Sequence, residues 1–406
     1  MKWSKIINKE ENTLYIEKVQ RIASVLNNHS PEDFSLLSGA AGQILFHFYH
    51  SRVFNNNRSN DKAMELINHI FDHFNSTPLG YTFSSGLAGI GWLIEFIEQQ
   101  GFIQCDTDDI IGQLDDLIYN TMIAEIKAGE FDYLHAAGGM VLYYLTRKNN
   151  KKINSYISDY VDHLNDVCIW ENDACKWFSA IRLSDGTEEN ACNLSMSHGL
   201  ASIIAVLNRI YKRNINVGKT EKLISGSVRY LLSVMQSTDE FSSYFPDIVY
   251  QKEHKGQTSR MAWCYGDMGI GISLLDIAHT MNNKEWETIA IKVLLNCTKR
   301  RDLEKNHVLD ACLCHGSAGL AHLLNRLYHK TNLNEFKEAA IFWYSKTIEF
   351  ANDKKSLSGF VNVNAEEYGG SKEDFGFLVG ISGIGLALLS GISDIDPTWD
   401  QILLIS

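Results

Sequence analysis

The chain has 406 residues, 45% of them hydrophobic, and a formal net charge of −12. This length and composition allow a large buried core. The acidic balance argues against a nucleic-acid partner, because binding to phosphates needs clustered Lys and Arg side chains. Eight cysteines in a chain of this length are ordinary usage and do not indicate a disulfide framework.

The first residues of the chain and the length of its apolar runs indicate the cellular compartment. The first ten residues contain no apolar signal-peptide core. No apolar run is long enough to span a bilayer. We therefore expect a cytoplasmic protein without a transmembrane segment, in which thiols stay reduced. Only four prolines occur, and so few helix breakers favour long helices.

Seven short segments repeat along the chain. Each has a small or polar residue, two glycines three residues apart, and then an apolar run. In chain order they are Ser38–Gly42, Ser85–Gly89, His135–Gly139, His198–Ser202, Tyr265–Gly269, His315–Gly319 and Val379–Gly383. Two segments depart from the pattern, since Ala136 replaces the first glycine of the third and Ser202 the second glycine of the fourth. Successive segments lie 47 to 67 residues apart, a spacing that suits a pair of helices with loops.

The stretches between these segments have helical periodicity. Asn60–Phe74, Ile110–Ala128 and Glu221–Met235 each combine an apolar stripe with a charged face. The first and last segments are as apolar as the middle ones, whereas the ends of an open solenoid usually carry polar caps. These features favour an all-α fold, an α/α toroid (double α-barrel) of seven helical hairpin repeats. Such a toroid would form a single domain over residues 1–406.

Residues 147–192 interrupt the regular pattern. Val167–Trp170 and Lys176–Leu183 are strand-like stretches among polar turns. A small insertion between repeats three and four could therefore sit within the toroid at this point.

Cys264, Cys314 and His315 are candidate metal ligands. Cys264 precedes Cys314 by 50 residues, which is one repeat step, so in a toroid both would lie in equivalent loops at the same end. Two thiolates and one imidazole suit zinc, and three ligands leave the fourth tetrahedral position open, as in catalytic zinc sites. Either cysteine alone would more often be a small buried hydrophobic residue. Cys312, two residues before Cys314, remains a rival ligand.

Other residues could carry acid–base chemistry. His198 occupies the place in its segment that His315 holds two segments later, so it should face the same cavity as a ligand or as an acid or base near pH 7. His135 holds the equivalent place in the third segment. Asp132 could orient a histidine or accept a proton, although helix capping or surface exposure is the usual role of such a residue. Arg260 could stabilise a developing anion or hold a carboxylate.

Taken together, these residues resemble the lanthionine synthetase C-like family, the cyclases of lanthipeptide biosynthesis. Trp263–Gly266 and Cys314–Gly316 match the zinc-site signatures of that family, and Ser197–Gly199 is similar to its third signature. The resemblance implies a toroid of seven repeats. It also implies one zinc ion per chain on Cys264, Cys314 and His315, with His198, Asp132 and Arg260 as active-site residues.

The resemblance also implies a reaction. In such cyclases, a cysteine thiol of a precursor peptide adds to dehydroalanine or dehydrobutyrine in the same peptide. This intramolecular Michael addition forms a (methyl)lanthionine thioether ring, a step in the biosynthesis of peptide antibiotics. Zinc coordination would deprotonate the thiol, whose ordinary pKa is about 8.5. His198 would then be the acid that protonates the resulting enolate carbon.

The implied partners are a dehydrated precursor peptide with leader and core segments, a dehydratase and an exporter. The last two would bring the chain to the inner face of the membrane, and an insertion at 147–192 could bind the leader. Two alternatives remain open, and a third is disfavoured. One is a family enzyme that adds glutathione or another free thiol to dehydroamino acids. Another is a non-catalytic, zinc-containing scaffold that binds peptides. A zinc-free toroid such as an inverting glycoside hydrolase is disfavoured, because the glycine segments offer no spaced carboxylate pair.

Overall fold

The computed structural model describes residues 2–8, 10, 12–74, 79–182, 186–252, 256–363 and 370–406. The helices within these ranges are α1 (Asn12–Asn27), α2 (Ala40–Phe54), α3 (Asn57–Phe74), α4 (Leu87–Gln99), α5 (Thr107–Ile111), α6 (Leu114–Lys127), α7 (Ala137–Thr146), α8 (Lys151–Asp166), α9 (Leu200–Lys212), α10 (Val217–Ser233), α11 (Asp267–Thr280), α12 (Lys284–Lys299), α13 (Ser317–Thr331), α14 (Asn334–Phe350), α15 (Ile381–Ile392) and the 3-10 helix η2 (Thr398–Leu403). Five short strands are β1 (Ile169–Glu171), β2 (Ala174–Lys176), β3 (Ser179–Arg182), β4 (Glu188–Asn193) and β5 (Ile248–Tyr250).

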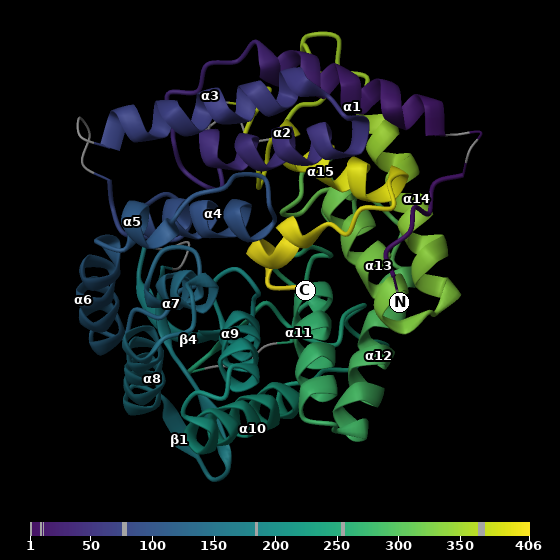
Figure 1. The fold of residues 1–406 in the computed structure, drawn as a ribbon. Helices are drawn as coiled ribbons and strands as arrows, with labels where there is room; N and C mark the ends of the chain where they lie inside the picture. The colour runs from purple at the N-terminus through teal and green to yellow at the C-terminus, as the bar shows by residue number, and fades with distance from the viewer. Residues whose placement is uncertain are drawn as a thin grey trace.

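The helices form two concentric rings (Figure 1). The inner ring consists of α2, α4, α7, α9, α11, α13 and α15, and the outer ring of α1, α3, α6, α8, α10, α12 and α14. Neighbouring inner and outer helices pack as hairpins, and α15 packs on both α1 and α2, so the two ends of the chain close the ring. The predicted α/α toroid of seven hairpins is confirmed.

The repeated segments mark the starts of the inner helices. Each inner helix begins one residue after the first glycine position, for example at Ala40 and Asp267. Among the outer helices, the predicted Asn60–Phe74 and Glu221–Met235 correspond to α3 and α10. The prediction of one helix over Ile110–Ala128 was wrong in one respect. The chain breaks there between α5 and α6 at Gly112, a poor helix former.

Glycines are required in these segments because neighbouring backbone and side-chain atoms leave no room for a Cβ. A Cβ at Gly383 would lie 1.8 Å from the carbonyl oxygen of Phe377 and 2.6 Å from Cδ1 of Leu313 in the neighbouring repeat. Gly266 has φ of +87°, a conformation that other residues rarely adopt. Ala136, which replaces the glycine in the third segment, has an extended backbone with φ of −142°. The loop before each inner helix therefore folds back tightly on the helix start.

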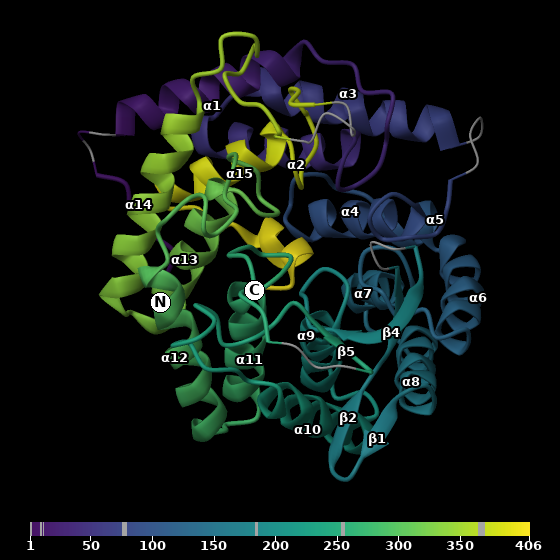
Figure 2. The ribbon, with the colours of Figure 1, turned by 180° about the vertical axis from the view of Figure 1, so that it is seen from behind.

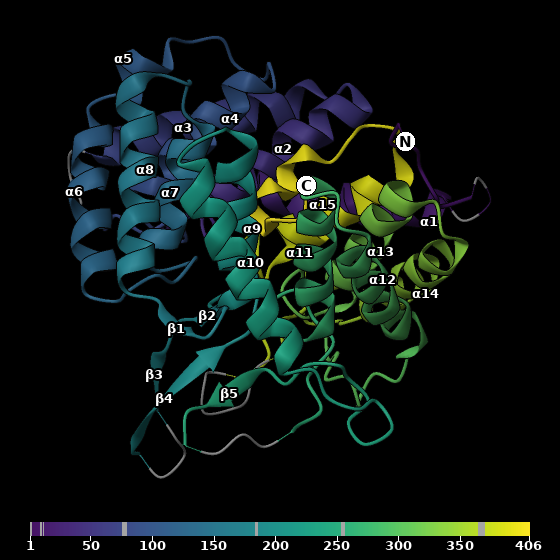
Figure 3. The ribbon, with the colours of Figure 1, turned by 90° about the horizontal axis from the view of Figure 1, so that it is seen from below.

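The strands lie at one end of the toroid, in front of the ring in Figure 2 and below it in Figure 3. β1 and β2 form an antiparallel hairpin, and β3, β4 and β5 form an antiparallel sheet.

The strand-like stretches predicted from the sequence overlap β1, β2 and β3, although Leu183 lies outside the described residues. α8 falls within 147–192 but belongs to the outer ring, and β5 comes from the connection between α10 and α11. The single domain over 1–406 and the insertion at 147–192 stay predictions.

The C-terminal segment fills the centre of the ring (Figure 1). Nε1 of Trp263 donates a hydrogen bond of 2.8 Å to the carbonyl oxygen of Leu403. The fully buried Asp400 carboxylate bonds to His322 at 2.9 Å and to Arg326 at 2.7 Å. These contacts come from the loop before α11 and from α13, so the segment ties two inner helices to the centre of the ring. None of the described helices is both long and apolar enough to cross a membrane.

Candidate metal centre and active site

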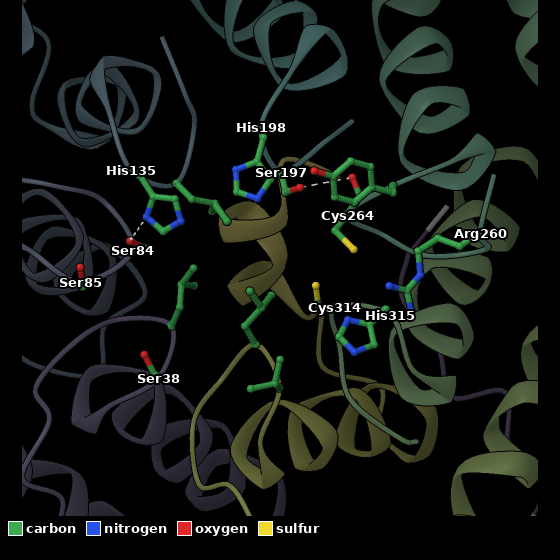
Figure 4. Close-up of a pocket in the computed structure, with 15 residues that line it drawn as sticks. Ser38, Ser84, Ser85, His135, Ser197, His198, Arg260, Cys264, Cys314 and His315 are labelled. Carbon is green, nitrogen blue, oxygen red and sulfur yellow. Dashed lines mark hydrogen bonds between the residues drawn. The ribbon is translucent and has the colours of Figure 1, made fainter. Parts of the chain in front are cut away.

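A cavity of about 580 Å³ opens where the seven loops meet at the N-terminal ends of the inner helices (Figure 4). Each loop contributes the two residues that precede the first glycine position of its segment. These pairs are Leu37 and Ser38, Ser84 and Ser85, Leu134 and His135, Ser197 and His198, Cys264 and Tyr265, Cys314 and His315, and Leu378 and Val379. Arg260 also lines the cavity. The repeat thus delivers chemically different side chains to equivalent positions around one opening.

The first residue of each pair belongs to a belt of backbone hydrogen bonds. In order around the ring the belt consists of Leu37, Ser84, Leu134, Ser197, Cys264, Cys314 and Leu378. At six of the seven joints, the N–H of one residue donates to the carbonyl oxygen of the next, with N···O distances of 2.9 to 3.4 Å. No such bond joins Leu134 to Ser197 among the described residues. The belt holds the two cysteines as direct neighbours.

Cys264, Cys314 and His315 converge as predicted, with their ligand atoms all within 4.8 Å of one another. Figure 4 shows both sulfurs and the imidazole on one side of the cavity. The hydrogen bond from the Cys314 thiol, with further help from His315, holds the pKa of Cys264 well below its ordinary value. The same bond raises the pKa of Cys314. One sulfur is therefore already disposed to be a thiolate, and this set of two sulfurs and one imidazole fits zinc with one position left open.

The rival ligand Cys312 lies in a second cluster. Ligand atoms of Asp310, Cys312 and His315 also lie within 4.8 Å of one another. Burial and the negative charge of Asp310 raise the pKa of Cys312 well above its ordinary value. Its Sγ accepts the backbone N–H of His315 at 3.5 Å. These contacts suit a residue that supports His315 better than one that binds the metal.

His198 and Asp132 form a pair across the joint of the belt that lacks a backbone bond. Nδ1 of His198 lies 2.7 Å from Oδ2 of Asp132. Oδ1 of Asp132 accepts the backbone N–H groups of Leu134 and His135 at 2.7 and 2.8 Å. Burial by itself raises the pKa of Asp132, but the hydrogen bond and charge of His198 outweigh it and lower that pKa. The carboxylate therefore stays ionised and leaves Nε2 of His198 available to the cavity.

Arg260 lies on the side of the metal ligands, away from His198 (Figure 4). Its Nη2 donates to the carbonyl oxygen of His307 at 3.0 Å, and its buried Nε has no partner among the described residues. No described hydrogen bond or ion pair connects Arg260 to Asp132. Its positive charge instead contributes to the lowered pKa of Cys264.

For three residues near the cavity, the sequence pattern indicated no role or only a secondary one. The hydroxyl of Tyr265 accepts a hydrogen bond from Asn193 at 3.3 Å, and its ring lies 6.2 Å from that of His198. His135 bonds to Ser84 at 3.1 Å, and its ring stacks on that of His198 at 5.7 Å. Burial, together with the charge of a Cys264 thiolate, raises the pKa of Asp247 to about 7. The position before the first glycine could have identified Tyr265, whereas nothing in the repeat pattern points to Asp247.

Comparisons with known proteins identify a matching family, a related sequence and a similar solved structure. Residues 30–404 match the family described as "Lanthionine synthetase C-like protein". The "Nisin biosynthesis protein NisC" of Lactococcus lactis subsp. lactis is 24% identical over 428 residues, which cover 98% of this chain and 84% of that protein. The solved structure of "Nisin cyclase" superimposes with a TM-score of 0.74 and 18% identity over 98% of both chains. This structural likeness supports the assignment of the toroid fold.

Proposed function

The chain belongs to the lanthionine synthetase C-like family, and from this premise we propose that it is an enzyme that closes thioether rings in a peptide. The substrate would be a precursor peptide that contains cysteine and dehydroalanine or dehydrobutyrine. The observation that carries the proposal is the shared cavity, which has Cys264, Cys314 and His315 on one side and the His198–Asp132 pair close by. The cavity of about 580 Å³ is within the size range of small-molecule sites and would admit a short peptide segment.

Cys264, Cys314 and His315 would hold one zinc ion. When bound there, zinc would keep a substrate cysteine deprotonated near neutral pH. Two thiolate ligands donate strongly, which would preserve the nucleophilicity of that sulfur. The substrate sulfur forms a bond to the β-carbon of the dehydro residue, and the electron pair of the double bond moves toward the adjacent carbonyl as an enolate.

His198 supplies the proton that completes the reaction. Its Nε2 delivers the proton to the α-carbon, and the Asp132 carboxylate holds the ring orientation and stabilises the imidazolium form beforehand. The proton that leaves the substrate thiol balances the one added at carbon, so the product is an isomer of the substrate. Arg260 and Tyr265 line the cavity, and in this proposal they donate hydrogen bonds to the enolate oxygen.

We place the enzyme in the cytoplasm, where thiols remain reduced, with a leader-bearing precursor peptide as its partner. A dehydratase must act first, because the acceptor residue is a dehydrated serine or threonine, and an exporter would remove the product. The strands at the cavity end of the toroid are the proposed place for leader binding.

Ring closure leaves peptide mass unchanged, so the test counts free thiols. The purified, zinc-loaded protein is incubated with a dehydrated cysteine-containing peptide, treated with a thiol-alkylating reagent and measured by mass spectrometry. The proposal predicts loss of alkylation with the wild-type protein and full alkylation with Cys264→Ala/Cys314→Ala. Ring closure by the metal-free double variant would contradict it. Adducts formed only with added glutathione would support the alternative, thiol addition between molecules.

A further inference from the structure

A second hollow adjoins the cavity. Ser38 lines both, and the second hollow has a volume of about 460 Å³ beside the start of α2. Its charged lining residues are Glu32, Asp33, Lys372, Glu373 and Asp374, four carboxylates against one ammonium group. We call this hollow the acidic recess. Building on the proposed function, we propose that the acidic recess binds a basic side chain in the substrate peptide, next to the residues that react.

The local fold explains the position of two of these carboxylates but not their charge. Asp33 and Asp374 each accept a backbone N–H two residues further on, at 2.8 Å, in the turn before an inner helix. Asn193 makes the same turn in repeat four, with its Oδ1 2.9 Å from the corresponding N–H. The turn therefore needs a side-chain oxygen and works without a negative charge. A charge at a helix start can also stabilise the helix, so stability must be measured separately.

A third carboxylate is fixed in its ionised form. Glu373 accepts hydrogen bonds from the Ser356 hydroxyl and from the backbone of Leu357 and Ser358 at 2.7 to 3.1 Å. Burial alone would raise its pKa, but these bonds outweigh burial and lower it. Glu32, at the edge of the recess, is exposed. The recess thus presents several negative charges to whatever enters from the cavity.

An unsatisfied donor in the wall indicates what else the ligand must carry. Gln43 is only 1% exposed, and its Oε1 bonds to Nδ1 of His29 at 3.3 Å. Its Nε2 has no hydrogen-bond partner among the described residues. His29 stacks on Phe375 at 3.9 Å, so the same wall also offers an aromatic surface. A free metal cation would satisfy the carboxylates and leave this donor unpaired. A peptide supplies both a cationic side chain and carbonyl oxygens.

Binding of unreactive peptides tests the proposal independently of ring closure. Fluorescent peptides carry serine for the reacting cysteine and alanine for the dehydro residue, and a single lysine is moved one position at a time. Glutamine at the same position is the matched control. The wild-type protein should bind one lysine register about three- to fivefold more tightly than its glutamine control, as expected for an ion pair at a partly exposed site. A preference of equal size in every register would indicate attraction to the net charge and would overturn the proposal.

The variant Glu32→Gln/Asp33→Asn/Asp374→Asn removes the charge and keeps the turns. It should lose the lysine preference while it retains zinc and melts within a few degrees of the wild type. Glu335→Gln/Glu338→Gln/Glu349→Gln on the outer helix α14 removes the same charge elsewhere and should keep the preference. A retained preference in the first variant, or equal loss in both, would overturn the proposal.

Gln43→Met provides a second, independent readout. It removes an unpaired buried donor together with the hydrogen bond between Gln43 Oε1 and His29, so it should change the melting temperature little and yet weaken peptide binding. Unchanged peptide binding would overturn the role of Gln43. Because the peptides do not react, a missing register preference with intact ring closure rejects only the acidic recess. A register preference without ring closure rejects only the proposed cyclase function.

Discussion

Nδ1 of His198 lies 2.7 Å from Oδ2 of Asp132, across the one joint of the seven-residue belt where the described residues show no backbone hydrogen bond. At the other six joints, backbone groups connect one repeat to the next. Here two side chains make the connection, and one of them faces the cavity. The pair that we assign to proton transfer therefore also bridges repeats three and four.

Asp132→Asn tests the role of the carboxylate in this pair. Asparagine keeps an oxygen for the two backbone N–H groups but loses the charge that stabilises the imidazolium form of His198. We expect the rate of ring closure to fall about a hundredfold or more, while zinc content and melting temperature change little. The single-turnover rate, measured by thiol alkylation, checks this, and a fall of less than threefold would reject the assignment.

His198→Gln and His135→Gln form a matched pair of variants. Both histidines line the cavity and their rings stack, but His198 bonds to Asp132 through its imidazole and His135 through its backbone N–H. His198→Gln should slow ring closure by about 10² to 10⁴ at saturating peptide, whereas His135→Gln should slow it less than tenfold. Equal losses in the two variants would mean that proton delivery is shared between the two imidazoles.

Cys314→Ser and Cys312→Ser separate the two overlapping ligand clusters. Cys314→Ser should abolish stoichiometric zinc binding, because it removes one of three ligands. Cys312→Ser should keep one zinc ion per chain, since the Cys312 sulfur accepts the backbone N–H of His315 and does not belong to the Cys264, Cys314 and His315 group. Elemental analysis after dialysis against a weak chelator measures both. Zinc loss in Cys312→Ser with retention in Cys314→Ser would reverse the assignment.

Asp400 should make stability depend on pH. Burial alone would raise its pKa, but Arg326 and His322 bring it down to about 2, below the value of about 3.9 for an unfolded chain. A lowered pKa stabilises the fold above about pH 4, and this contribution, about 2–3 kcal/mol, is lost as the pH falls toward 2.

Asp400→Asn should therefore be less stable than the wild type by about 3–5 kcal/mol at pH 7, with a gap that narrows below pH 4. Denaturant titrations at several pH values measure the gap. Asp396→Asn is the control, because its ion pair with Arg326 is more than half exposed on the aspartate side and should contribute under about 1 kcal/mol. A gap that does not change with pH would contradict the lowered pKa.

The repeat pattern was sufficient to predict the seven helical hairpins, the closed ring and the meeting of Cys264, Cys314 and His315. Glycine spacing and apolar periodicity are local signals, and equivalent positions in a closed ring necessarily lie at the same end. The position of Arg260 beside the metal ligands, and not beside Asp132, could not be predicted, because it depends on how one loop packs on the next. Likewise, nothing local to Asp400 indicates that it enters the centre of the ring.

X-ray absorption at the zinc edge tests the central claim most directly, because it reports the metal and its open position together. The resting protein should hold one zinc ion with two sulfur ligands at about 2.3 Å and lighter ligands at about 2.0–2.1 Å. Addition of an unreactive cysteine peptide, with alanine in place of the dehydro residue, should raise the sulfur count from two to three. Absence of zinc, or a sulfur count that the peptide leaves unchanged, would contradict the account.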